Sequence, residues 1–305
     1  MGLSRTTVNV FVGCCSSAFL MEILMARKPS SANLVTFLQF FFITLYGFIV
    51  TTKFGSVVPK IPLKQYIILV ALFFVTTVAN NYVYALHVPS TLHMIIRSAS
   101  SPASMLVYCC VKKQLPKLNN AVGSVLISIG VALAMYGGAP TDEENKGTFL
   151  YWCIGVTILL ATLITGAFTG IQQERLYSKY GKHPNEMLFY THALPMPVFL
   201  GIYPQLMDTS ADLTSDTWLL IALNILSQFY CTHSVHELAT KETSVTVTFI
   251  LTVRKFLSLL LSTVVFKNNL TVYHVIGTVF VAIGTYVYFD YFTSRRQGPV
   301  TMKNK

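Results

Sequence analysis

A stretch of 22 residues, from Val245 to Phe266, constrains this chain most, because it is apolar enough to cross a lipid bilayer yet carries Arg254 and Lys255 near its middle. A helix rises about 1.5 Å per residue, so this segment would cover a hydrocarbon core roughly 30 Å thick. Each cation at the centre of such a helix costs about 2.5–3.5 kcal/mol on insertion scales, unless an anion or water receives it. Because neighbouring residues point about 100° apart on a helix, we expect one cation to meet a ligand and the other to meet a protein acid or a water-filled cavity.

The composition indicates an all-α, polytopic membrane protein. Of the 305 residues, 53% are hydrophobic and only 11% are charged, whereas soluble domains carry roughly 25% charged residues. The net charge of +10 does not indicate nucleic-acid binding, because no soluble domain is available to carry a basic groove. The six cysteines lie within or at the rims of apolar segments, so we expect buried thiols without disulfides or a metal site: Cys14, Cys15, Cys109, Cys110, Cys153 and Cys231.

Hydropathy windows predict ten membrane spans in a single transmembrane domain that covers residues 1–305. Proline, glycine and short polar runs separate them. The predicted spans are residues 8–26, 32–52, 62–83, 89–111, 118–138, 149–172, 186–207, 217–236, 244–266 and 271–293, followed by a tail at 294–305. An even number of spans places both termini on the same side of the membrane.

The basic residues predict which side that is. Fifteen of them fall on the side of the termini and four on the other, and the positive-inside rule then makes both termini cytosolic. The fifteen are Arg5, Lys53, Lys60, Lys64, Lys112, Lys113, Lys117, Arg175, Lys179, Lys182, Lys241, Arg295, Arg296, Lys303 and Lys305; the four are Arg27, Lys28, Lys146 and Lys267.

A spacing of lysine and glycines recurs in the two halves of the chain. Lys113, Gly123 and Gly130 are separated by ten and seven residues, and the same spacings separate Lys267, Gly277 and Gly284. The fourth span also carries a cation, Arg97, as the ninth span does. These matches predict a five-plus-five inverted repeat, about residues 1–138 and 149–293, with a binding site near the midplane at the interface of the halves.

Arg97, Arg254 and Lys255 are the basic residues that the predicted spans contain. Arginine can bind phosphate through two parallel hydrogen bonds and lysine acts as a compact charge, so the three together predict a cavity for a polyanion. The alternative is a structural ion pair with Glu22, the one acid well inside a span. One acid cannot neutralise three cations, which favours a ligand role for at least one of them.

Two clusters of polar residues are candidates for binding the uncharged parts of a ligand. Asn80, Asn81 and Tyr82 end the third span, and Tyr190, Thr191 and His192 begin the seventh. Such groups face a bundle interior when they lie at lipid depth, where they would suit a sugar or a base, or would simply bond between helices. The pattern HxxHE at His233, His236 and Glu237 is not a zinc-protease motif and indicates a helix-end hydrogen-bond cluster rather than a metal site. No catalytic motif or cofactor site is predicted.

Long ordered runs of the chain resemble the nucleotide-sugar transporters of the drug/metabolite transporter superfamily, in particular the solute carrier 35 B branch. The runs are FVGCCSSAFLMEILMARK, NLVTFLQFFF, HMIIRSAS, GKHPNEMLFYTHALPMP, TVTFILTVRKFLSLLLS and HVIGTVFVAIGTYVYF. The resemblance implies ten helices in the five-plus-five repeat and residence in the Golgi or endoplasmic reticulum. It also implies exchange of a cytosolic UDP-sugar, UDP-N-acetylglucosamine or UDP-xylose, for lumenal UMP.

Two motifs of the family can be carried over to this sequence. The seventh-span FYNN, which contacts the base in GDP-mannose transporters, corresponds to residues 189–192, FYTH. The ninth-span GALNK, whose lysine holds phosphate, corresponds at its last position to Lys255. Both asparagines of FYNN are replaced, by Thr191 and His192, which favours uridine over guanine.

Together these observations predict a UDP-sugar/UMP antiporter and not an enzyme. Lys255 and Arg97 would hold the diphosphate, Tyr190, Thr191 and His192 the base, and residues 80–82 the sugar. Two other functions stay open: export of another organic anion, and a multi-pass scaffold or receptor without transport. The sequence allows a homodimer without requiring one.

Overall fold

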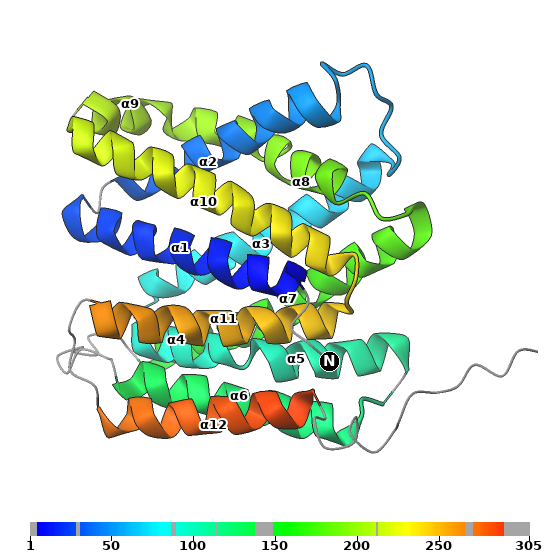
Figure 1. Ribbon diagram of the computed structural model, residues 1–305, viewed down its shortest axis with the longest axis vertical. Helices are drawn as coiled ribbons and strands as arrows, with labels where there is room; N and C mark the ends of the chain where they lie inside the picture. The colour runs from blue at the N-terminus through cyan, green and yellow to red at the C-terminus, as the bar shows by residue number, and fades with distance from the viewer. Residues whose placement is uncertain are drawn as a thin grey trace, which may run out of the picture.

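The computed structural model is a bundle of roughly parallel and antiparallel helices stacked in layers (Figure 1). It describes residues 5–28, 31–86, 90–113, 115–137, 149–211, 213–265 and 271–289. The helices are α1 (Arg5–Arg27), α2 (Ala32–Tyr46), η2 (Gly47–Thr51), α3 (Leu63–Ala85), α4 (Ser90–Ser98), α5 (Ser100–Lys112), α6 (Leu118–Gly137), α7 (Phe149–Tyr180), α8 (Pro184–Ala193), η3 (Met196–Ile202), α9 (Tyr203–Ala211), α10 (Ser215–Ala239), α11 (Ser244–Val265) and α12 (Val272–Tyr288). The prediction of an all-α fold is confirmed.

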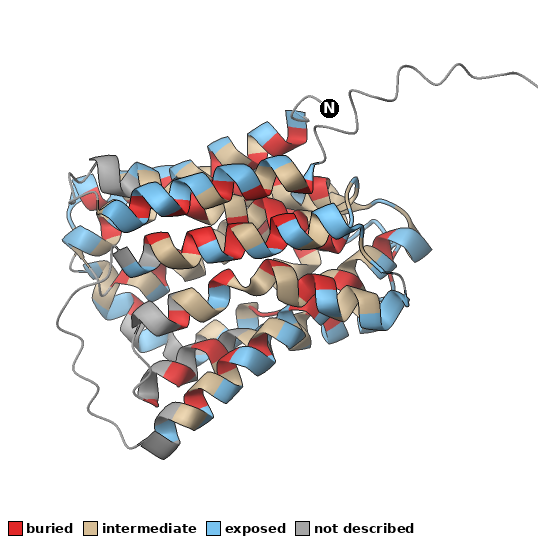
Figure 2. Cartoon of the chain, turned by 90° about the horizontal axis from the view of Figure 1, so that it is seen from below, coloured by how far each residue is buried: buried red, intermediate tan, exposed pale blue. Residues whose placement is uncertain are grey.

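Four of the described helices are long and apolar enough to cross a membrane by themselves: Arg5–Arg27, Ala32–Thr51, Cys153–Tyr180 and Ser244–Leu261. Shorter apolar helices cover Leu63–Thr76, Leu118–Ala134 and Val272–Tyr288. Helical segments lie within all ten predicted spans, while the count of ten crossings stays a prediction. Exposed residues lie along the helices on the outside of the bundle (Figure 2). Many exposed residues are large and apolar, such as Val12, Phe73, Leu106 and Val275, which suits a surface covered by lipid.

The fourth and seventh predicted spans are each broken into shorter helices, and proline accounts for both breaks. Pro102 cannot donate a backbone hydrogen bond to Ser98, four residues earlier, so α4 ends there and α5 begins at Ser100. The polar groups at this break are bonded nonetheless: the Ser128 hydroxyl of α6 donates to the Ser98 carbonyl at 3.0 Å, and the Ser98 hydroxyl donates to the Ser128 carbonyl at 3.2 Å. In the seventh span, Pro195 and Pro197 follow α8 and the chain continues as the 3-10 helix η3.

The repeated glycines of the sequence meet in the structure, on the facing surfaces of α6 and α12. A Cβ built on Gly130 would lie 2.7 Å from the Gly277 carbonyl oxygen, and one built on Gly277 would lie 2.6 Å from that of Gly130. Gly123 and Gly284 have the same reciprocal relation. The two helices are therefore antiparallel and their backbones touch, which only glycine permits. The division of the chain into inverted repeats stays a prediction.

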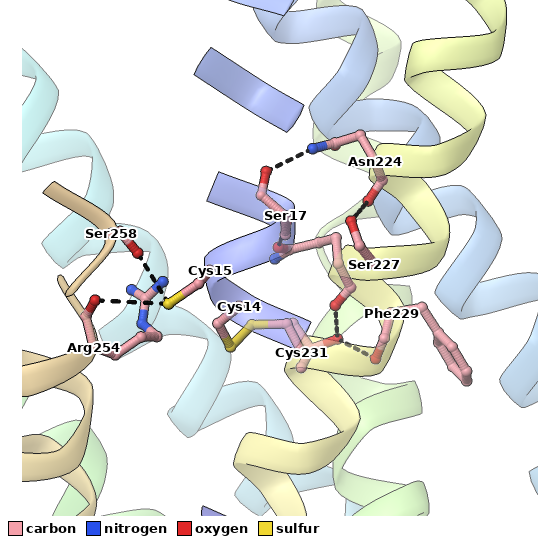
Figure 3. The surroundings of a disulfide bond; sticks show 11 residues. Cys14, Cys15, Ser17, Asn224, Ser227, Phe229, Cys231, Arg254 and Ser258 are labelled. Carbon is pink, nitrogen blue, oxygen red and sulfur yellow. Dashed lines mark hydrogen bonds between the residues drawn. A yellow bond between two sulfur atoms is a disulfide. The ribbon is translucent and has the colours of Figure 1, made fainter. Parts of the chain in front are cut away.

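The expectation of free thiols throughout was wrong for two of the six cysteines. Cys14 of α1 and Cys231 of α10 form a disulfide, with their Cα atoms 4.6 Å apart (Figure 3). The pairing was not predictable from spacing, because the two residues are 217 positions apart and become neighbours only when α1 packs along α10. Cys15, Cys109, Cys110 and Cys153 are free thiols.

The contact of α6 with α12 gives a prediction for stability. Gly130→Ala and Gly277→Ala should each lower the free energy of unfolding by about 1–3 kcal/mol, because the added methyl group must push two backbones apart. Thermal melts of the purified variants measure this. Gly201→Ala is the matched control, because nothing lies within 4 Å of the position of its new Cβ, and its melt should match the wild type. Equal melting of all three variants would contradict the close contact of the two helices.

Candidate functional site

A cavity of about 220 Å³ lies where α3, the α4–α5 break, α7 and α11 meet. Its lining is mainly polar: Thr76, Asn80, Arg97, Ser100, Ser104, Thr162, Leu163, Gly166, Ala167, Thr248, Leu251, Thr252, Arg254 and Lys255. Since α3 and α5 come from the first half of the chain and α7 and α11 from the second, the cavity lies between the halves.

All three basic residues that sequence analysis singled out line this cavity. Arg97 lies at the end of α4, and Arg254 and Lys255 lie side by side on α11. The adjacent cations of α11 were expected to meet a ligand in one case and a protein acid or a water-filled cavity in the other, and both contribute to the lining of this one cavity. Two long flexible stems on one helix can bend toward a common space even though their Cβ atoms point apart.

No carboxylate neutralises these cations within the part of the chain that the structure describes. The described ion pairs are Lys112 with Glu174 and Lys241 with Glu237, and neither involves a residue of the cavity. The charged side chains whose fields act on Lys255 are Arg97 and Arg254. The Arg254 Nε is buried without a hydrogen-bond partner. Such an arrangement is stable only if an anion or water enters the cavity.

The alternative ion pair of Lys255 with Glu22 is not among the described contacts. Glu22 is an exposed residue of α1, a helix that does not line the cavity. The part of α1 that contacts α11 here is seven residues earlier, where the Cys15 thiol contacts the Arg254 carbonyl oxygen at 4.0 Å and accepts from Ser258 at 3.4 Å (Figure 3). The disulfide of the preceding residue, Cys14, ties this point of α1 to α10.

The start of α5 adds to the positive potential of the cavity. Ser100 and Ser104, in the first turns of α5, both line it. The N-terminus of a helix carries a partial positive charge and unpaired N–H groups, so broken membrane helices commonly turn such an end toward an anion. Two hydroxyl pairs join α5 to α11 here, Ser100 with Thr252 at 3.4 Å and Ser104 with Thr248 at 3.5 Å.

Of the three residues expected at a sugar end, the structure describes the side chain of Asn80. Asn80 lines the cavity and is buried, but its amide is bonded within the protein: Nδ2 donates to the Thr76 carbonyl at 2.7 Å, and Oδ1 accepts from Thr162 at 3.1 Å. The bond from Thr162 of α7 is the interhelical bonding that the sequence left open as its alternative. Asn81 and Tyr82 lie in α3, and their side chains are outside the described residues.

The residues expected at the base end form a separate cluster on α8. The Tyr190 ring stacks on Tyr66 of α3 with centroids 4.6 Å apart. The Thr191 hydroxyl donates to the Met187 carbonyl of its own helix at 2.7 Å. The His192 ring packs on Phe40 with centroids 4.7 Å apart, and its Nδ1 lies 2.8 Å from the Leu188 carbonyl oxygen. None of the three lines the cavity described above.

His236 and Glu237 form separate contacts at the end of α10. His236 bonds to Gln173 and Tyr177 of α7 at 3.1 and 3.4 Å. Glu237 accepts from Lys241 at 2.6 Å and from Thr6 at 3.3 Å. The hydrogen bond and charge of Lys241 lower the pKa of Glu237, so this carboxylate is ionised at neutral pH.

Sequence analysis missed the hydroxyl residues of the cavity. Ser100 and Ser104, and Thr248 and Thr252, are pairs four residues apart, the spacing that places two side chains on one face of a helix. That signal was available, but serine and threonine are frequent in membrane helices for packing reasons alone. Only the position of the cations marks these faces as lining a cavity.

Comparison with known proteins identifies a family and several proteins to which this chain is similar. Residues 4–291 match the UAA transporter family. The UDP-xylose and UDP-N-acetylglucosamine transporter of Danio rerio is 38% identical over 93% of both chains. The endoplasmic reticulum GDP-fucose transporter of Drosophila melanogaster is 36% identical, over 92% of this chain and 88% of its own length. The human nucleotide sugar transporter SLC35B4 is 35% identical over 92% of both. A crystal structure of a protein only 14% identical has a TM-score of 0.65 over 96% of this chain and 98% of that one, which shows a shared fold.

The cations without acidic partners give a prediction that separates a ligand site from a structural ion pair. Lys255→Met should leave the melting temperature unchanged or raise it, because the change removes an unpaired charge from a partly buried cavity. If Lys255 instead paired with Glu22, the variant would lose about 3–5 kcal/mol. Thermal melts measure the difference. A large loss that Glu22→Gln restores would contradict the absence of a structural pair.

Proposed function

Because the chain belongs to the UAA transporter family, we propose that it carries nucleotide sugars across a membrane, exchanging a cytosolic UDP-sugar for lumenal UMP. The observation that carries this proposal is the meeting of Arg97, Arg254 and Lys255 in one cavity without an acidic partner among the described residues. The diphosphate of a nucleotide sugar supplies the negative charge that these residues lack. UMP is also an anion, so exchange would leave the cavity neutralised in both directions of transport.

Lys255 and Arg97 hold the phosphates in this proposal, and Arg254 adds a third positive charge to the cavity. Arginine and lysine contact phosphate differently: the planar guanidinium forms two parallel hydrogen bonds with one phosphate, while the ammonium acts as a compact charge. The start of α5 and the hydroxyl of Ser100 can donate to the remaining phosphate oxygens.

Uracil is the base that the chain favours, and the cluster around Tyr190 is its proposed site. This cluster and the cavity share α3, so a nucleotide can lie along this helix. On α3, Thr76 of the cavity and Tyr66 of the cluster are ten residues apart, which is about 15 Å along the helix axis. Thr191 and His192 replace the asparagines of the guanine-binding motif, which favours uracil. One relative is a GDP-fucose transporter, so guanine is the base against which uracil must be compared.

The orientation and the compartment follow from the basic residues and the relatives. The excess of basic residues on the side of the termini favours a cytosolic location for both. One relative carries the endoplasmic reticulum in its name, and we propose residence in that membrane or in the Golgi. The cavity at the interface of the two halves suits alternating access, in which one half rocks against the other around a fixed site.

Transport into proteoliposomes tests the proposal. Vesicles loaded with UMP should take up UDP-N-acetylglucosamine or UDP-xylose faster than empty vesicles, and external UMP and UDP should inhibit this uptake far more strongly than GMP and GDP. Guanine nucleotides that inhibit as well as uridine nucleotides would remove the cluster around Tyr190 from base recognition. Failure to transport any nucleotide sugar, with uptake of another organic anion, would contradict the proposed substrate class.

A further inference from the structure

Glu174 of α7 ties together three of the helices that line the cavity. Its Oε2 accepts the backbone N–H of Ser244, at the start of α11, at 2.7 Å. Its Oε1 accepts from the Tyr108 hydroxyl of α5 at 3.4 Å and pairs with the Lys112 Nζ, also of α5, at 3.6 Å. One carboxylate thus joins α5, α7 and α11, and α5 belongs to the opposite half of the chain from the other two.

These contacts lie directly beyond one end of the cavity. Ser104 and Thr248 line the cavity and contact each other at 3.5 Å. Tyr108 and Ser244 are each one helical turn further toward the end of the bundle where α5 ends and α11 begins. Glu174 therefore closes the space between the three helices immediately past the last lining residues on that side.

The lining residues of α4 and α5 differ in exposure along the chain. Ser104, next to the Glu174 contacts, is only 1% exposed. Arg97, on the other side of the α4–α5 break, is exposed and also lines the cavity. Along α4 and α5, the lining is thus buried next to the Glu174 contacts and exposed beyond the break.

We propose that Glu174 is the latch that closes the cavity on the side of the termini and must be released before a ligand can enter or leave there. This inference rests on the proposed transport function. The ion pair suits a latch because both of its charged groups can be hydrated when it opens: the Lys112 and Glu174 side chains are 35% and 19% exposed.

Glu237 supplies the matched control. It lies at the same end of the bundle and also crosses between the halves, through Thr6 and Lys241, but it ties α1 to α10, and neither helix lines the cavity. Glu174→Ala and Glu237→Ala therefore remove equivalent acids, and only the first releases helices of the cavity.

Thiol labelling measures the latch directly. The free cysteines Cys15, Cys109, Cys110 and Cys153 are replaced by serine and a reporter is introduced as Ser104→Cys. Sealed vesicles are then treated with a membrane-impermeant maleimide, and Lys182→Cys in the α7–α8 connection serves as the reference for the side of the termini. Glu174→Ala should speed labelling of the reporter from that side on the order of tenfold, since it removes charge-assisted bonds from a two-state equilibrium. Glu237→Ala should leave the rate unchanged.

Equal labelling rates in the two variants would overturn the latch. Lys112→Gln provides a second route if Glu174→Ala folds poorly, because it keeps the hydrogen bonds of Glu174 to α11 and Tyr108; it should give a smaller increase, and no increase would again contradict the proposal. The rates are measured without nucleotide, so they are independent of the substrate. If the variants label as expected but the protein transports no nucleotide sugar, the latch proposal stands and the proposed transport function is contradicted.

Discussion

Three positive charges that share one cavity inside an apolar bundle are the constraint on which the arrangement of this protein depends. Arg97, Arg254 and Lys255 repel one another, and no described carboxylate neutralises them. In surroundings of low dielectric this repulsion is large, so the bundle must provide water or an anion where the three meet. The cavity between the two halves of the chain is that place, and its lining of hydroxyl groups is what a soluble anion requires on leaving water.

The helices around the cavity are shaped by the same need. A continuous fourth span would have no free N–H groups at mid-depth, whereas the break that Pro102 imposes gives α5 a start beside the cations. Ser128 bonds to Ser98 at the break, so the interruption leaves no unpaired carbonyl there. On the far side of the bundle, α6 and α12 are held in backbone contact by Gly130 and Gly277.

Much of the fold could be predicted from the sequence, because hydrophobicity and charge act locally in a membrane. The helical class, the positions of the helices and the three costly cations all follow from the free energy of placing residues in lipid. The matching glycines of α6 and α12 were visible as a spacing, and the structure brings them into contact.

What the sequence could not provide are the facts that depend on which helices become neighbours. The disulfide between Cys14 and Cys231 needs α1 to pack along α10. The bonding of Asn80 to Thr162 needs α3 to pack along α7. The separation of Tyr190 from the cations, and the contacts of Glu174 with two other helices, have the same origin. The sequence pattern within one helix indicates which residues need partners, but only the packing of the helices determines which residues those partners are.

The affinity of the purified protein for UMP, measured by titration calorimetry for the wild type and Lys255→Ala, tests the central claim most directly. If the phosphate neutralises Lys255, the variant loses a charge-assisted contact in a partly dry cavity and should bind about tenfold to a hundredfold more weakly, with its melting temperature maintained. Lys255→Arg should recover only part of the affinity, because the longer planar group needs a different geometry. Unchanged affinity for UMP in Lys255→Ala would contradict the assignment of this cavity as the phosphate site.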